Sequence, residues 1–159
     1  MQPKIEKLNQ STFIGKRTKM SLTNNTTRKL WQSFMPERKI IPNTIGSEYY
    51  SIEVYSPDYF KNFSPDKPFE KWAAVETTNA DIIPEGMETI TLPEGLYVVF
   101  IHKGPASDGP KTYQYIFQTW LPNSKYALDN RPHFAKMGEK YKSEDPDSEE
   151  EIWIPIKPK

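Results

Sequence analysis

Two glutamates lie close to tryptophans in segments whose apolar and polar residues alternate as in β-strands. Glu76 follows Trp72 by four residues, and Glu151 precedes Trp153 by two. Because successive side chains of a strand point to opposite faces, each carboxylate shares a face with its indole. A carboxylate beside an aromatic face can bind an organic cation. It could also serve as a general acid or base, so Glu76 and Glu151 are the catalytic candidates if the protein is an enzyme.

Further aromatic residues are available to line such a site, because the chain has four Trp, nine Tyr and eight Phe. We expect a cleft for a flat or aromatic molecule. Helical rings can equally pack in the core, which makes Trp72 and Trp153 the preferred ring candidates. Glu53, between Tyr49 and Tyr55, is a weaker acid candidate. The candidate ligand-binding residues are Trp31, Phe34, Tyr50, Trp72, Glu76, Tyr113, Phe117, Trp120, Glu151 and Trp153.

Several other kinds of site are not supported. The chain has no cysteine and only two histidines, His102 and His133, which lack the spacing of metal ligands. No Ser-His-Asp spacing, phosphate-binding glycine loop or zinc-binding helix motif occurs. We therefore expect no metal and no cofactor.

The charge balance is neutral, with 21 Lys plus Arg against 21 Asp plus Glu. It gives no reason to expect nucleic acid or an anionic membrane as a partner. The first thirty residues contain no apolar run long enough for a signal peptide or a membrane span. We expect a cytoplasmic protein.

The first half of the chain predicts strands separated by one helix. Residues 4–20 read as one long, irregular strand with a bulge or bend at Gly15. Asn24 or Asn25 could cap a helix containing Leu30, Trp31 and Phe34 and limited by Pro36. Alternation then predicts strands over residues 49–55 and 69–78.

The second half repeats this order. A continuous apolar run predicts a central strand over residues 96–104, and helical spacing of aromatic residues predicts a helix over 111–121. Two short strands follow near 131–137 and 151–156, separated by an acidic surface loop. The order is βαββ twice, with halves of about 1–80 and 81–159 within one domain. We expect an α+β fold with antiparallel sheets, whose two helices flank a central aromatic cleft.

Four segments together resemble a known family: WAAVE at 72–76, IPEGMETITLPEGLYVVFIHKGP at 83–105, TWLPNSKYALDNRPHF at 119–134 and EIWIPI at 151–156. They are similar to the GyrI-like effector-binding domain, which is also fused to AraC-type and MerR-type bacterial regulators. The resemblance implies paired βαββ units of the SHS2 type and an aromatic cleft for xenobiotic, often cationic compounds. Relatives carry Phe-Glu on the strand after the second helix, where this sequence has Phe134-Ala135, so Ala135 joins the site candidates.

The opening residues resemble stand-alone members without a DNA-binding domain, and we expect a small-molecule-binding protein, monomeric or homodimeric. Related stand-alone proteins inhibit gyrase or hydrolyse cyclopropane-bearing toxins. One alternative is therefore a cofactor-free hydrolase of such electrophiles that uses Glu76 or Glu151. A second is a protein-interaction role, with gyrase or a regulator as partner and the acidic loop 144–151 as the contact.

Overall fold

One strongly curved antiparallel sheet forms the frame of the computed structural model, which describes residues 2–159. The strand order is β1-β6-β9-β8-β3-β4-β2-β5, and β7 pairs separately with β9. The strands are β1 Lys4–Leu8, β2 Ser11–Met20, β3 Tyr49–Val54, β4 Phe69–Thr77, β5 Glu88–Leu92, β6 Gly95–Lys103, β7 Tyr126–Leu128, β8 His133–Met137 and β9 Glu149–Pro158.

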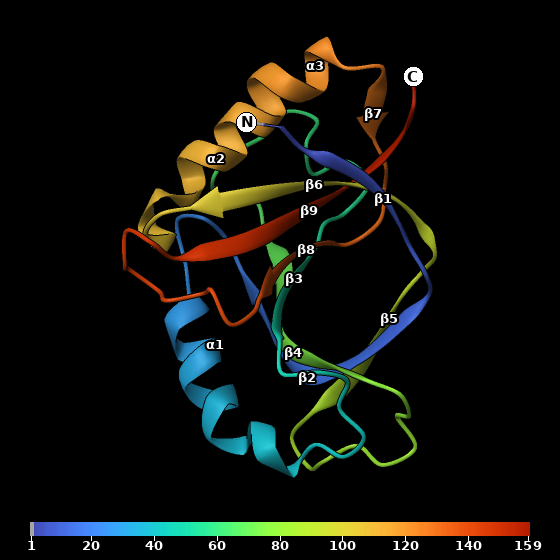
Figure 1. Ribbon diagram of the computed structural model, residues 1–159, viewed down its shortest axis with the longest axis vertical. Coiled ribbons are helices and arrows are strands. Elements are labelled where there is room, and N and C mark those ends of the chain that lie inside the picture. Colours follow the sequence, from blue (N-terminus) through green and yellow to red (C-terminus); the bar gives the residue numbers. More distant parts are fainter. Residues whose placement is uncertain (1) are drawn as a thin grey trace.

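The helices lie outside the curve of this sheet (Figure 1). The first is α1, Thr27–Phe34, which runs into the 3₁₀ helix η1, Met35–Ile40. After the short η2, Ala106–Asp108, comes α2, Gly109–Tyr115, which continues through the π-helix η3, Ile116–Trp120, into α3, Leu121–Asn123. The order β2-α1-β3-β4 in one half matches β6-α2-β8-β9 in the other. The predicted α+β fold with duplicated βαββ units is confirmed.

Both helical segments cover the same face of the sheet. Leu30 and Phe34 of α1 pack on Ile14 and Ala73, and Ile116 packs with Phe100 and Ile152. The strand register joins these positions in one row, because Ala73 pairs with Ser51, Ser51 with Ala135, Ala135 with Ile152 and Ile152 with Phe100. We call this the helix face. Its middle, between α1 and α2, has only small side chains in the row.

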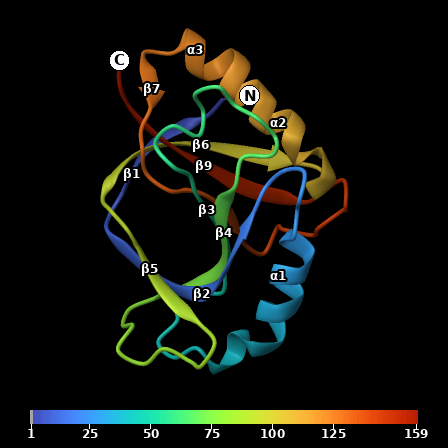
Figure 2. The same ribbon diagram turned by 180° about the vertical axis from the view of Figure 1, so that it is seen from behind.

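The opposite face forms the inside of the curve. Leu8 and Tyr97, from the β1–β6 end of the sheet, share one apolar cluster with Phe13 and Leu92, from the β2–β5 end. Strands at opposite ends of the order can share a cluster only if the sheet bends back towards itself, as the two views show (Figures 1 and 2). We call this the inner face, and it contains the largest aromatic core.

The predicted long strand over residues 4–20 is wrong, because two strands occupy this segment. β1 pairs with β6 of the second half, whereas β2 pairs with β4 and β5. Gly15 is not a bulge, because its register with Ala74 is continuous with that of its neighbours. A Cβ at this position would lie 2.0 Å from the carbonyl oxygen of Ala73. Close backbone approach therefore explains the glycine.

The sequence analysis did not predict two of the strands, and it predicted a longer acidic loop before the last strand than the structure has. β5 and β7 are short, with five and three residues, so alternation gave little signal for either. The acidic segment 149–151 belongs to β9, where Glu150 pairs with His102 of β6. Local charge suggested a solvated loop, but the cross-strand pairing with β6 extends the strand into it.

Candidate functional site

The sheet divides the predicted site residues between its two opposite faces. Tyr50, Trp72, Glu76, Glu151 and Trp153 lie on the inner face, as the register of β3, β4, β8 and β9 requires. The other candidates lie on the helix face: Trp31, Phe34, Tyr113, Phe117, Trp120 and Ala135. The structure therefore brings together parts of the predicted set, not the whole.

On the inner face, the aromatic rings pack against one another. Phe134 stacks on Trp153 with ring centroids 5.0 Å apart, and Tyr97 contacts both. The Trp153 indole N–H donates to Glu151 Oε1 at 2.9 Å, so this predicted carboxylate–indole pair exists. The Trp72 indole instead donates to Glu70. These carboxylates hold core tryptophans in place.

Three of the helical rings attach their helices to the sheet. Phe34 is fully buried, and Trp31 packs edge-on against it at 5.9 Å. Trp120 packs edge-on against Phe100 of β6 at 5.4 Å and stacks on Tyr126. Trp31, Phe34 and Trp120 thus take the core-packing role that a helical aromatic stripe usually has.

The helix face also holds a buried carboxylate between the two helical segments. Glu53 of β3 is only 8% exposed, and its Oε2 has no hydrogen-bond partner among the described residues. Buried polar groups in native proteins are nearly always hydrogen-bonded, and an unpaired one carries a free-energy penalty. An orphaned carboxylate in a folded domain therefore calls for a functional explanation.

The surroundings of Glu53 disfavour its charge. Burial raises its pKa to about 7, and the negative charge of Glu150 adds to this, whereas Lys71 and the Ser51 hydroxyl lower it. Lys71 is the cross-strand partner of Glu53 on β4 but makes no ion pair with it within the described residues. At neutral pH the carboxyl group is therefore poised between its protonated and ionised forms.

Aromatic groups from three elements surround this carboxylate. Tyr55 follows Glu53 on the same face, and His133 of β8 is its cross-strand partner. Tyr55 meets the His133 ring edge-on at 4.8 Å, and Phe117 lies nearly parallel to the His133 ring at 6.2 Å. Tyr113 of α2 is close enough for Glu53 to raise its pKa further above the level that burial sets. We call Glu53, Tyr55, Tyr113, Phe117 and His133 the Glu53 site.

His133 contributes to this site as a neutral ring. Burial, with a smaller effect of the positive charge of Arg131, lowers its pKa to about 3. Phe117 lies in the π-helix η3, and π-turns occur frequently at functional sites. The sequence predicted Tyr113 and Phe117 as ligand contacts, and the structure places both beside Glu53.

Ala135 lies next to the Glu53 site. It pairs with Ser51, two residue pairs along from Glu53 and His133, so its side chain shares the helix face with them. The position where relatives are expected to carry glutamate is thus adjacent to a carboxylate of the neighbouring strand.

A hollow of about 180 Å³ adjoins the Glu53 site. Its inner wall includes Tyr55, Phe60 and His133, and its other side is formed by the turn that contains Asp129 and Arg131. Ligand pockets usually measure about 300–1,000 Å³, so this hollow is too small for a drug-sized molecule as it stands.

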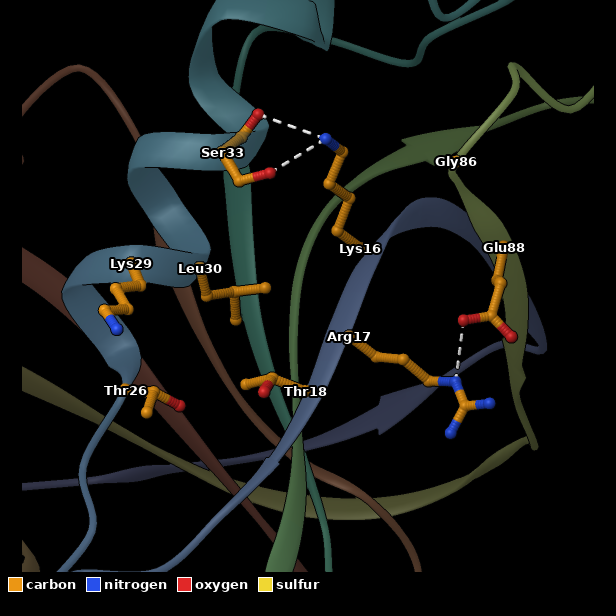
Figure 3. Close-up of a pocket in the computed structure, with 9 residues that line it drawn as sticks. All are labelled: Lys16, Arg17, Thr18, Thr26, Lys29, Leu30, Ser33, Gly86 and Glu88. Atoms are coloured by element: carbon orange, nitrogen blue, oxygen red, sulfur yellow. Dashed lines mark hydrogen bonds and ion pairs between the residues drawn. The ribbon is translucent and has the colours of Figure 1, made fainter.

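A larger hollow of about 430 Å³ lies on the far side of α1, beside β2 (Figure 3). Its walls combine polar and apolar surface, and two of its cations are already paired: Lys16 bonds to Ser33 and Glu37, and Arg17 bonds to Glu88. It has no aromatic lining residue. Size alone favours this hollow, but its chemistry does not suit an apolar or aromatic ligand.

Two expected absences bear on the site. Among residues 2–159, no group of three or more His, Asp or Glu side chains is arranged to hold a metal ion. No helix in the same range is long and apolar enough to cross a membrane.

The family model of the GyrI-like small molecule binding domain matches residues 1–157. The chain belongs to the GyrI-like family. A curated relative of this GyrI-like domain is the transcriptional regulator BrlR of Pseudomonas aeruginosa strain PAO1, 26% identical over 138 residues. The match covers 86% of this chain and 48% of BrlR, so the chain spans about half the length of that relative.

Solved structures support the fold of this GyrI-like domain. The EcmrR C-terminal domain has a TM-score of 0.72, with 16% identity, and the match covers 99% of this chain and 98% of that domain. SAV2435 bound to tetraphenylphosphonium has a TM-score of 0.70, with 18% identity over 99% of this chain and 94% of its own.

The sequence analysis placed Glu53 below Glu76 and Glu151 as an acid candidate, and it did not place Phe60 or His133 beside Glu53. A usable signal was present, because Tyr50, Ile52 and Val54 alternate with Glu53, which puts Glu53 on the face opposite those apolar residues. Two helices in a repeated βαββ order must cover it, so Glu53 had to lie under or between them.

Proposed function

We propose that this GyrI-like domain binds a small organic cation that carries flat aromatic groups, and that Glu53 is its counter-ion. One observation carries the proposal: a buried carboxylate oxygen without a partner lies among aromatic rings. A cation bound there would supply the missing charge partner. Aromatic faces attract cations and offer rigid contact area to planar groups.

The position of Glu53 supports this reading. Ala135 removes the acid that the family resemblance leads us to expect on β8, and Glu53 offers a carboxylate two residue pairs away on the same face. SAV2435, which shares the fold, is bound to the aromatic cation tetraphenylphosphonium. That compound is therefore a suitable first probe for this chain.

The test is calorimetric titration of the protein with tetraphenylphosphonium at pH 8. Glu53→Gln should weaken binding at least about tenfold, because the amide keeps the shape of the side chain and removes the charge. Glu151→Gln is the matched control, since Glu151 is paired with Trp153 on the inner face. Equal affinities of wild type and Glu53→Gln would exclude Glu53 as the counter-ion.

The stability of Glu53→Gln shows whether misfolding could explain a loss of binding. It removes a buried group whose charge is disfavoured, so the variant should be at least as stable as the wild type at pH 8. A loss of binding by a stable variant would then report on the site itself.

A further inference from the structure

The loop between β3 and β4 passes over the helix face and reaches α2, as the green segment in Figure 2 shows. The recorded ring contact joins Phe60 of the loop to Phe117 of η3, the continuation of α2. Phe60 lies 5.4 Å from Phe117 and 5.7 Å from His133, centroid to centroid, with its plane nearly parallel to both. It also meets Tyr55 edge-on at 5.0 Å. Phe60 therefore touches three of the five residues of the Glu53 site.

Phe60 also lies where the Glu53 site meets the adjoining hollow. Tyr55, Phe60 and His133 line that hollow, and the same rings lie against the site. Phe60 keeps 39% of its surface exposed, whereas His133 beneath it is 5% exposed. The ring thus lies between solvent and the buried groups, like a cover.

The rest of the loop is built to present this ring. The Lys67 ammonium donates to the carbonyl oxygens of Asp58, Tyr59 and Lys61 at 3.0, 3.2 and 2.8 Å. Tyr59 is 3% exposed and packs with Met20 and Phe69, which anchors the loop next to Phe60. The loop therefore has an organised turn with one firm anchor, followed directly by the Phe60 ring, whose recorded contacts are stacked and edge-on aromatic ones.

We propose that residues 56–67 form a lid over the Glu53 site, and that a bound ligand takes the place of the Phe60 ring. The inference rests on the function proposed above. The volume argues for it, because a hollow of about 180 Å³ cannot admit an aromatic cation unless a side chain moves. Of the three rings in the wall, Tyr55, Phe60 and His133, only Phe60 is exposed, so it is the ring that can leave.

The lid makes a prediction about affinity. If binding requires the open form, the apparent affinity is reduced by the fraction of molecules that are open. Phe60→Ala removes the ring and leaves the lid backbone and its Lys67 contacts in place. The variant should bind tetraphenylphosphonium about tenfold more tightly than the wild type, which corresponds to loss of stacking contacts of ordinary strength.

Phe63→Ala is the matched control. Phe63 belongs to the same lid and is 51% exposed, but its recorded ring contact is with Tyr59 and not with the Glu53 site. It should bind the probe as the wild type does. The lid would be overturned if Phe60→Ala bound the probe with the same affinity as Phe63→Ala. It would also be overturned if Phe60→Ala bound more weakly than the wild type, because Phe60 would then be a permanent ligand contact.

A second measurement needs no ligand. If Phe60 keeps water from Glu53, Phe60→Ala should hydrate the carboxylate and reduce the loss of stability between pH 5 and pH 8, and Phe63→Ala should not. The same pH dependence in both variants would overturn the lid. If the wild type fails to bind the probe, the proposed function fails, and this second measurement alone decides whether residues 56–67 cover Glu53.

Discussion

Glu53 of β3 and His133 of β8 are direct cross-strand partners, and both side chains are buried. The pKa of each is shifted towards the uncharged form: upwards for the carboxyl group and downwards for the imidazole. Among the described residues, no ion pair joins the Glu53 carboxylate to the His133 imidazole. At neutral pH the imidazole is therefore uncharged and the carboxyl group is divided between its protonated and ionised forms, with aromatic rings beside them.

The stability of the protein should fall as pH rises through the titration of Glu53. Its pKa is about 7 in the folded state and about 4.5 when unperturbed, so the folded state binds more protons between these values. The charge is disfavoured in the folded protein by about 3 kcal/mol above pH 7. Glu53→Gln removes this effect. The check is denaturant unfolding of Glu53→Gln and wild type at pH 5 and pH 8. From pH 5 to pH 8, the unfolding free energy of the variant should rise relative to that of the wild type by up to about 3 kcal/mol. The same difference between the two proteins at both pH values would contradict the assignment.

His133 should act in the opposite sense at lower pH. Its pKa is about 3 in the folded state against an ordinary 6.5, so the unfolded state binds more protons in that window. Its contribution to stability is present above pH 6.5 and is lost as pH falls, by about 3 kcal/mol at pH 4. His133→Phe keeps a flat ring without the titration. Its unfolding free energy should decline less between pH 7 and pH 4 than that of the wild type, and parallel declines would show that His133 is not responsible.

Restoring an acid at position 135 should change both stability and binding. Ala135 is 5% exposed and lies two residue pairs from Glu53 on the helix face. Ala135→Glu adds a second carboxyl group to a buried region, which should lower stability at pH 8 by about 3 kcal/mol, because its charge has no partner there. The added negative charge should strengthen binding of tetraphenylphosphonium at the same pH. Ala135→Gln controls for size, and equal effects of the two substitutions would exclude a role for the charge.

Gly15 should tolerate no side chain. An added Cβ would lie 2.0 Å from the Ala73 carbonyl oxygen and 2.7 Å from Ala74 Cα, both backbone atoms of a central strand. Gly15→Ala should therefore destabilise the protein by about 2–3 kcal/mol, measured by denaturant unfolding. Gly109→Ala is the comparison, because nothing lies within 4 Å of a Cβ at that position and its φ is helical. Similar stabilities of the two variants would show that the strands can move apart at Gly15.

The sequence by itself determined most of the elements and their order, although not the split of β1 from β2 or the short β5 and β7. Alternation of Tyr50, Ile52 and Val54 defined β3, the apolar run defined β6, and helical spacing of aromatic residues defined α2. These patterns are local, because the period of the backbone dictates which side chains share a face. They were enough for the α+β class, the βαββ repeat and two contacts of the Glu53 site, Tyr113 and Phe117.

Only the tertiary structure decided which faces meet. Alternation relates residues within one strand, but strand register and sheet curvature relate residues of different strands, and neither is encoded in any single segment. The register put Trp72 and Trp153 on the inner face and Glu53 opposite His133 on the helix face. The β3–β4 loop then brought Phe60 onto Phe117, 57 residues further along the chain. Buried area in three dimensions, not local pattern, turned an ordinary strand glutamate into the centre of the candidate site.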